Sequence, residues 1–285
     1  MSAASTHKGG PVATKIHFIS GLPRSGTTLL SALLLQNPRF TAAVTSPVAS
    51  LLRAVHGQMC GGEFDVFFND ANRKTILRSV VDAYYAEVPA NNLVFDTNRT
   101  WTGKAALLEE LYPGTRIICC VREAALIVDS LERMLNKNPL QLSRIFNFQP
   151  GSSVYSRAET LMHVETGLIG RALATLREAW FGEFARMLIV IPYETLAREP
   201  KLTMQRLYEE LGEAPFEHDF EHLQHAAPEY DAAIGMPGLH TIREKVQYVE
   251  REPILPPDLL AKLAAVNFWK QPKLNARGVK LFQMS

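Results

Sequence analysis

The sequence contains little cysteine: only Cys60, Cys119 and Cys120 among 285 residues. An odd number that includes an adjacent pair inside an apolar run argues against a disulfide framework. Reduced thiols are typical of a cytosolic compartment, so we expect a cytoplasmic protein. Because Cys119 and Cys120 are neighbours in a predicted strand, their side chains should point to opposite faces and cannot chelate one metal together.

The sequence also lacks an excess of charge and long hydrophobic runs. Thirty lysines and arginines balance twenty-nine aspartates and glutamates, which gives a formal net charge of +1. Nucleic-acid and polybasic membrane binders usually show a basic excess, so we expect neither partner, and any anion site must be local. Nowhere do eighteen uncharged apolar residues run together, and the polar N-terminus lacks the apolar core of a signal peptide. We expect residues 1–14 to be a disordered tail.

The apolar residues, 47% of the chain, form short runs that alternate with stretches of helical periodicity. This alternation predicts an α/β fold with a central parallel sheet and helices on both faces. The expected strands are 15–20, 93–96, 116–121 and 187–191, and the expected helices include 27–36, 124–136 and one beginning near 256–258. No linker divides the chain, so we expect 15–285 to be one domain, with a helical insertion near 47–88 and a lid near 139–156.

The most informative stretch follows the first predicted strand and reads Gly21-Leu22-Pro23-Arg24-Ser25-Gly26-Thr27-Thr28. The two glycines allow the backbone to fold around a phosphate, and the next helix presents its free amides to that anion. The pattern is that of the phosphate-binding loop GxxxxGK[ST], except that Thr27 replaces the lysine and the cation stands at Arg24. A nucleoside triphosphate therefore loses its usual clamp, and the loop suits a single 5′-phosphate. The alternative is a strand-to-helix turn without a ligand.

The segment GLPRSGTTLL resembles the 5′-phosphosulfate-binding loop of the sulfotransferases that use 3′-phosphoadenosine-5′-phosphosulfate (PAPS), which runs Pro-(Lys/Arg)-(Ser/Thr)-Gly-Thr-Thr. The arginine form is most similar to the tyrosyl-protein branch and to many bacterial members. The resemblance implies a P-loop-type three-layer α/β fold. It also implies transfer of a sulfuryl group from PAPS to a hydroxyl, phenol or amine, with adenosine 3′,5′-bisphosphate as product and no metal.

A second cofactor signal lies at the end of the third predicted strand. Arg122 stands there, and Ser130 follows eight residues later in the next predicted helix. The guanidinium and the hydroxyl can both donate to a phosphate, and the pair resembles the family's 3′-phosphate site. Tyr193 resembles the family tyrosine near the adenine. The resemblance also implies a late basic loop that closes over the 3′-phosphate, with Arg243 as the candidate for that role and Lys245 as a second one. Arg122 in a surface pair and Tyr193 packed on a helix start are the alternatives.

A hydroxyl acceptor also needs a base to take its proton. Relatives use His or Glu, but the corresponding segment here, Val44-Thr45-Ser46-Pro47, has no carboxylate. We therefore predict that Asp96, at the end of the second predicted strand, is the base and that Arg99 contacts the sulfonate or the acceptor. Asp96 could instead cap the following loop. Glu63 and His56 are reserve candidates.

Two other functions remain open at this point. One is a nucleotide or small-molecule kinase with a variant loop, and the other is a non-catalytic nucleotide-binding or scaffold protein. The acceptor, a small molecule or a peptide, has no signature in the sequence, and either a monomer or a homodimer is expected. We interpret His218, His222 and His225 as one solvated helix face and not as a metal site, because they lack the HExxH pattern.

Overall fold

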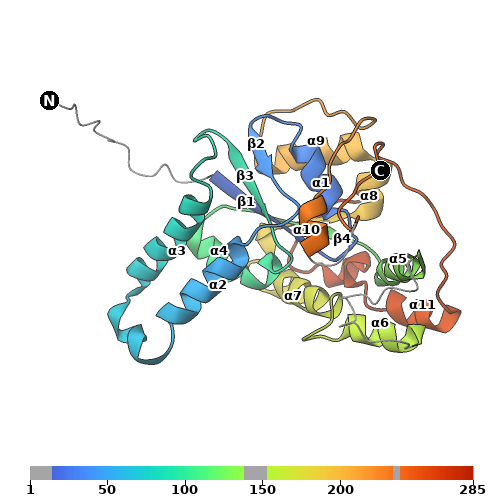
Figure 1. Cartoon of the computed structure of the whole chain (residues 1–285), viewed down its shortest axis with the longest axis horizontal. Coiled ribbons are helices and arrows are strands. Elements are labelled where there is room, and N and C mark those ends of the chain that lie inside the picture. Colours follow the sequence, from blue (N-terminus) through green and yellow to red (C-terminus); the bar gives the residue numbers. More distant parts are fainter. Residues whose placement is uncertain (1–14, 138–152, 234–237, 285) are drawn as a thin grey trace.

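The computed structural model describes residues 15–137, 153–233 and 238–284. Its centre is a sheet in which every pair of neighbouring strands is parallel, in the order β2-β3-β1-β4-β5-β6 (Figure 1). The strands are β1 (Lys15–Gly21), β2 (Phe40–Ala42), β3 (Leu93–Thr97), β4 (Ile117–Val121), β5 (Leu188–Pro192) and β6 (Lys280–Leu281). The expected parallel α/β fold is thus confirmed.

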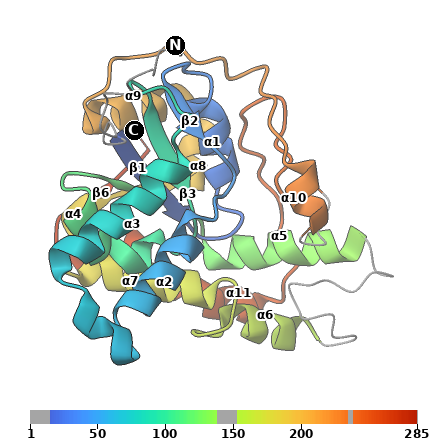
Figure 2. The same cartoon turned by 60° about the vertical axis from the view of Figure 1, so that its left-hand side comes forward.

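Helices cover both faces of this sheet, so its central strands are buried almost throughout. Alternate residues of a strand point to opposite faces, and Cys119 and Cys120 accordingly belong to two separate hydrophobic clusters. One cluster packs α1 (Thr27–Leu34) and α9 (Pro200–Leu211) against the sheet, with Leu196 of α8 (Tyr193–Arg198). The other packs the helices of the opposite face, and Figures 1 and 2 show the two groups on either side. The three-layer arrangement is therefore present.

The helices of the second face include most of those expected. They are α2 (Val48–Met59), α3 (Asp70–Tyr84), α4 (Ala105–Leu111), α5 (Ala124–Lys137), α6 (Val154–Met162), α7 (Gly170–Phe181) and α11 (Pro257–Ala264). Short 3-10 turns join them: η1 (Gly62–Phe67), η2 (Trp101–Lys104), η4 (Ala185–Met187), η5 (Phe268–Lys270) and η6 (Pro272–Leu274). The helical segment expected near 47–88 corresponds to α2, η1 and α3.

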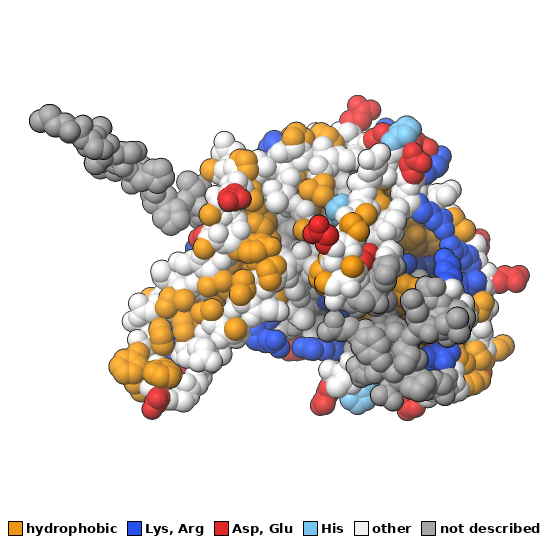
Figure 3. Space-filling model, viewed as in Figure 1, with side chains coloured by type: hydrophobic (Ala, Val, Ile, Leu, Met, Phe, Trp, Pro, Cys, Tyr) orange, Lys and Arg blue, Asp and Glu red, His pale blue; other side chains and the backbone are white. Residues whose placement is uncertain are grey.

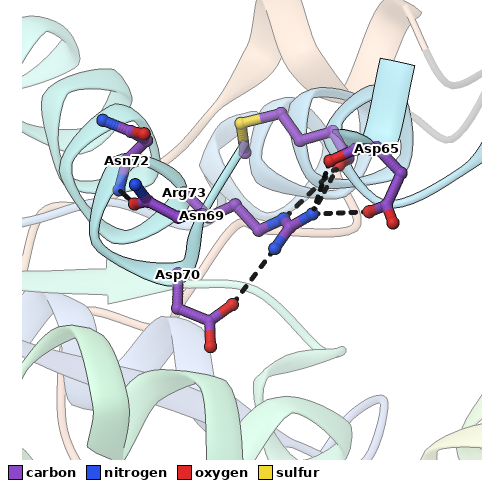
Figure 4. A network of polar contacts seen from close by, with 6 residues as sticks. Asp65, Asn69, Asp70, Asn72 and Arg73 are labelled. Carbon is purple, nitrogen blue, oxygen red and sulfur yellow. Dashed lines mark hydrogen bonds and ion pairs between the residues drawn. The ribbon is translucent and has the colours of Figure 1, made fainter. Parts of the chain in front are cut away.

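Helices α2 and α3 form an arm whose tip is held by one arginine (Figure 4). Arg73 donates to the carboxylates of Asp65 and Asp70 and to the backbone oxygen of Met59, while the side chain of Asn69 caps α3. The apolar side chains of η1, by contrast, are exposed, with Phe67 at 74%. The arm therefore keeps its shape through polar contacts at its tip and apolar packing nearer the sheet.

Several expectations lie on segments that the structure does not describe or that take another form. The tail 1–14 lies outside the described residues, and so do residues 139–152 of the lid expected near 139–156. The last residues of that lid, 153–156, belong to α6 and its cap. The segment from His218 to His225 is not helical, so our helix interpretation was wrong there. In the described part of the chain no three His, Cys, Asp or Glu residues could hold a metal ion, and no helix is long and apolar enough to span a bilayer.

Candidate active site

The predicted phosphate-binding loop, residues 21–28, has the backbone that its glycines predict. Gly26, the N-cap of α1, has a φ of 95°, and a Cβ atom there would lie 2.9 Å from Cδ2 of Tyr193. At Gly21 a Cβ atom would lie 2.5 Å from the backbone oxygen of Cys120, so β4 packs directly on the loop. No side chain caps the first turn of α1, which leaves its amides available to an anion.

Arg24 and Ser25, adjacent in the loop, have different surroundings. Arg24 lies in the left-handed region, with a φ of 58°, and its Nη1 donates to the backbone oxygen of Leu239 at 2.6 Å. Burial and then the positive charge of Arg122 lower the pKa of Arg24. Ser25 is fully buried, and its hydroxyl donates to the backbone oxygens of Leu22 and Cys120 at 2.5 and 2.9 Å. Ser25 thus holds the loop against β4, whereas Arg24 lines a cavity.

The fold brings the second predicted anion site next to the loop. Arg122, directly after β4, donates from Nη1 to the backbone oxygen of Arg24 at 3.3 Å. Ser130, in α5, has its hydroxyl 3.4 Å from Nε of Arg24. The guanidinium carbon of Arg122 lies 4.6 Å from the centroid of the Tyr193 ring, and its Nε lies 3.9 Å from a carboxylate oxygen of Glu194. The four predicted side chains Arg24, Arg122, Ser130 and Tyr193 therefore form one cluster.

These residues line a cavity of about 860 Å³ at the carboxyl ends of the strands. Pro23, Gly26, Thr27 and Thr28 line it too, whereas Ser25 does not. Among the described residues that line this cavity there is no aspartate or glutamate, but there are nine cations: Arg24, Arg53, Arg99, Lys104, Arg122, Arg171, Arg243, Lys245 and Arg251. In a chain with a formal net charge of +1, the positive charge is concentrated in the cavity.

A long C-terminal segment, 238–251, completes the wall of the cavity. In Figure 2 the connection from α9 passes the outer side of α1 before it reaches α10 (Pro228–Ala233). His240 anchors this segment to α10, with its Nδ1 2.5 Å from a carboxylate oxygen of Asp231. Arg243 lines the cavity and is exposed, while Lys245 also pairs with Glu221 at 2.6 Å. Arg243 thus lines the cavity, as its predicted place in a late basic loop requires.

The two other predicted catalytic residues have different placements. Asp96 is 1% exposed and is not among the residues that line the cavity. Its carboxylate accepts hydrogen bonds from Ser46 and Tyr85 at 2.6 Å each and from the Trp101 indole at 2.8 Å. Burial raises the pKa of Asp96, against the effect of these three donors. This placement favours a structural role for Asp96 over that of a base in contact with an acceptor.

Arg99, in contrast, lines the cavity, and its backbone oxygen accepts a hydrogen bond from Ser20 at the end of β1. The side chain of Arg99 is accessible to solvent at the cavity. The protein atoms around it nevertheless displace much of its water, and this desolvation lowers the pKa of Arg99. The reserve bases His56 and Glu63 do not line the cavity. His240 is the imidazole among the described lining residues.

Our sequence analysis missed five lining residues with functional chemistry. Arg251 and His240 flank the basic stretch around Arg243, so a wider search of that stretch could have found them. Arg53, Lys104 and Arg171 are isolated basic residues on three separate elements. No local pattern marks these three, because only the fold brings them to one cavity.

Comparison with known proteins identifies the family. Residues 17–218, well over half of the chain, match the profile described as the Sulfotransferase family. The chain belongs to this family. The matched region holds the phosphate-binding loop, Arg99, Arg122, Ser130 and Tyr193, so most of the cluster described above lies inside the family region.

Individual relatives of this sulfotransferase-family chain are distant. Nodulation protein NoeE of Sinorhizobium fredii (strain NBRC 101917 / NGR234) is 29% identical over 217 residues, which cover 70% of this chain and 50% of that protein. The chain thus spans about half the length of the curated relative that it matches.

Two solved structures also resemble the chain. A sulfotransferase domain from the curacin biosynthetic pathway is 18% identical, with a TM-score of 0.46 and coverage of 72% of this chain and 75% of that one. A sulfotransferase from Alicyclobacillus acidocaldarius is 16% identical, with a TM-score of 0.48 and coverage of 78% and 91%.

Proposed function

We propose that this chain is an enzyme that transfers a sulfuryl group from PAPS to a hydroxyl, phenol or amine acceptor. Membership of the sulfotransferase family supports the reaction class. The observation that carries the choice of donor is the meeting of two anion sites in one cavity. The P-loop with Arg24 forms the first site, and Arg122 with Ser130 forms the second.

The arrangement of these two sites suits one nucleotide with separate 5′ and 3′ anions. The loop amides and Arg24 would hold the 5′-phosphosulfate, and Arg122, Ser130 and Arg243 would hold the 3′-phosphate. Tyr193 packs against Gly26 and under the guanidinium of Arg122, so its ring lies between the two sites, where an adenosine would pass. Two sites on unrelated faces of the fold would have argued against this donor. Arg24, Arg122 and Ser130 instead line the same cavity.

The donor groups of the cavity fit PAPS chemically. Lining cations and hydroxyls can bind phosphate and sulfate oxygens, and no lining carboxylate of the described residues would repel them. Bound PAPS would supply the sulfuryl group: its sulfur would form an S–O bond to a hydroxyl or phenol, or an S–N bond to an amine, as its S–O bond to the 5′-phosphate breaks. Arg24 and the α1 amides stabilise the charge that develops on the phosphate oxygen as that bond breaks. The proton of the acceptor passes to a base; Asp96, predicted from the sequence, does not line the cavity, whereas His240 is an imidazole that does.

The kinase alternative finds less support in this cavity. A kinase places carboxylates or amides at its magnesium ions and a lysine at the transferred phosphate. The described residues that line the cavity include no carboxylate, and Thr27 occupies the position of the P-loop lysine. Thermal unfolding with adenosine 3′,5′-bisphosphate, or with ATP and magnesium, separates the two functions.

We expect adenosine 3′,5′-bisphosphate to raise the unfolding temperature of the chain. At 100-fold over its dissociation constant a ligand adds about 2.7 kcal/mol of stability. For a chain of this size that is a shift of roughly 4–5 °C. ADP, which has no 3′-phosphate, should give a smaller shift because it leaves the Arg122 site unfilled. Stabilisation by magnesium ATP that equals or exceeds that by the bisphosphate would contradict the proposal and favour a kinase.

The scaffold alternative is tested by turnover with the same protein. An enzyme should release adenosine 3′,5′-bisphosphate from PAPS faster when an acceptor is added, and each equivalent of product should match one equivalent of sulfated acceptor. Tight binding of the bisphosphate with no acceptor-dependent turnover across hydroxyl, phenol and amine compounds would favour the non-catalytic function.

A further inference from the structure

The cations of the cavity divide into two groups. Five of them stand on the P-loop, at the end of β4 and in the segment 238–251. The other four stand on different elements: Arg53 in α2, Arg99 after β3, Lys104 at the end of η2 and Arg171 in the first turn of α7. We call these four residues the basic end of the cavity. Figure 3 shows Lys and Arg side chains gathered between the α2–α3 arm and the lower part of the body.

Packing fixes the elements that carry the basic end. Thr102 of η2 and Thr175 of α7 have their hydroxyl oxygens 3.1 Å apart. A Cβ atom at Gly103 would lie 3.0 Å from Cγ2 of Thr175, so η2 and α7 meet closely there. Asn98, just before Arg99, donates from its amide nitrogen to the backbone oxygen of Ser46 and so ties this loop to the start of α2. The basic end is therefore a built wall and not a set of independent surface side chains.

Within the described part of the chain, no side chain neutralises the four cations of the basic end. None makes a hydrogen bond or ion pair with any residue that the structure describes. Most arginines elsewhere in the fold do, for example Arg133 with Asp129 and Arg186 with Glu109. Burial and then the charge of Arg53 lower the pKa of Lys104, so these two cations repel each other. Repulsion among these like charges raises the free energy of the folded chain, and an anion bound there would offset that repulsion.

The proposed donor does not use up this charge. PAPS carries about four negative charges at neutral pH, of which the 3′-phosphate contributes about −1.5 to −2. The five cations around the P-loop and the segment 238–251 are sufficient for these. The basic end stands on other elements, namely α2, the loop after β3, η2 and α7, none of which carries any of those five cations. Its charge is therefore available to a second molecule.

The lining of the cavity also favours a polar second molecule. Its aromatic side chains other than His240 are Tyr193 and Tyr230, among the described residues, and it has no phenylalanine or tryptophan. Around the basic end stand hydroxyl side chains, those of Thr45, Ser50, Thr100, Thr166 and Thr175. A flat apolar acceptor would find little aromatic surface there, whereas a hydroxylated one would find many hydrogen-bond partners.

Resting on the sulfuryl transfer proposed above, we propose that the acceptor is a small hydroxylated compound that carries a carboxylate, phosphate or sulfate group. Arg53, Lys104 and Arg171 bind this anionic group at the basic end. The hydroxyl that accepts the sulfuryl group then faces Arg99 and the P-loop. The basic end thus selects acceptors by charge, while the other five cations of the cavity bind the donor.

The test compares two probes that differ in charge but share a ring: p-nitrophenyl β-D-glucuronide and p-nitrophenyl β-D-glucoside. Calorimetry measures the binding of each to protein saturated with adenosine 3′,5′-bisphosphate, so that the donor site is filled. We expect the glucuronide to bind at least about tenfold more tightly, since a hydrogen bond to a charged group contributes about 1.5–3 kcal/mol. Raising the salt from 0.05 to 0.5 M should reduce this preference, because salt screens the attraction.

A double variant, Arg53→Gln with Lys104→Gln, assigns the preference to the basic end. We expect it to bring the two dissociation constants within about threefold of each other. Its matched control is Lys201→Gln with Lys273→Gln, which also removes two positive charges, but from exposed positions outside the cavity. This control should keep the preference for the glucuronide. Equal affinities in the wild type, or an unchanged preference in the first variant, overturn the inference alone. Failure of the bisphosphate to bind at all overturns the proposed function and this inference with it.

Discussion

Arg24 combines an unusual backbone with an unusual side-chain position. It is the non-glycine residue with a positive φ in the described part of the chain, and its guanidinium lies between Ser130 and the backbone oxygen of Leu239. Strained backbone of this kind is found mostly where a binding site requires it. The side chain is held beside the loop before any anion arrives, so little reorganisation is needed when one binds.

We expect Arg24→Ala to lower turnover about 10²–10³-fold, the usual cost of losing one donor to a developing oxyanion. Initial rates of bisphosphate release from PAPS measure this effect. Arg24→Lys keeps the charge but loses the planar fork, so it should fall between the alanine variant and the wild type. Arg39→Ala, at an exposed arginine paired with Glu213, is the control and should keep the wild-type rate. An alanine variant with most of the wild-type rate would falsify the role of Arg24.

Asp96 gives a sharper test of structural against catalytic function. Because its carboxylate accepts three hydrogen bonds inside the fold, Asp96→Asn should lower the free energy of unfolding by about 1–3 kcal/mol. Turnover per folded molecule should change little, since the group does not line the cavity. Denaturant unfolding and steady-state kinetics on one preparation measure both. A loss of 10²-fold or more in turnover at unchanged stability would restore Asp96 as the base.

At the scale of elements, the turn from β1 to α1 decides how closely a ligand can approach the backbone. Gly26 has both a positive φ and a neighbour, the Tyr193 ring, that a methyl group would contact at 2.9 Å. We expect Gly26→Ala to weaken binding of adenosine 3′,5′-bisphosphate at least about tenfold, which corresponds to about 1.4 kcal/mol, because loop and ring must move apart. Calorimetric titration of the bisphosphate measures the loss.

Gly114, in the turn before β4, is the matched control for this substitution. Its φ of 82° is similar, but a Cβ atom there would meet nothing within 4 Å. Gly114→Ala should therefore cost stability through its backbone alone, about 1–2 kcal/mol, and leave nucleotide affinity unchanged. Equal losses of affinity in both variants would show that the contact with Tyr193 is unimportant.

The elements differ in how far their sequences predict them. The buried strands β1, β3, β4 and β5 were predicted to within about a residue, because helices on both faces require continuous apolar runs. The edge strands β2 and β6 were missed. They have three and two residues, too few to show any periodicity in the sequence. They form because the backbones of β3 and β5 pair with them.

At the scale of the whole molecule, the sequence predicted that the P-loop, Arg122 and Ser130 would lie together, but it did not predict the cations Arg53, Lys104 and Arg171 of the same cavity. The P-loop, Arg122 and Ser130 follow strand ends within short local patterns, and parallel strands bring their carboxyl ends to one edge. The partners of Asp96, at positions 46, 85 and 101, lie on three elements, and so do Arg53, Lys104 and Arg171. Contacts of this kind depend on how layers pack, which no local pattern records.

The C-terminal segment has a practical consequence for anyone who shortens this chain. The family region ends at residue 218, yet Tyr230, Arg243 and Arg251 lie beyond it and line the cavity, and β6 pairs with β5 still further on. A protein cut at the edge of the recognised region would lose a wall of its binding site together with an edge of its sheet. The residues that form the cavity and the sheet thus extend beyond the region that the family profile matches.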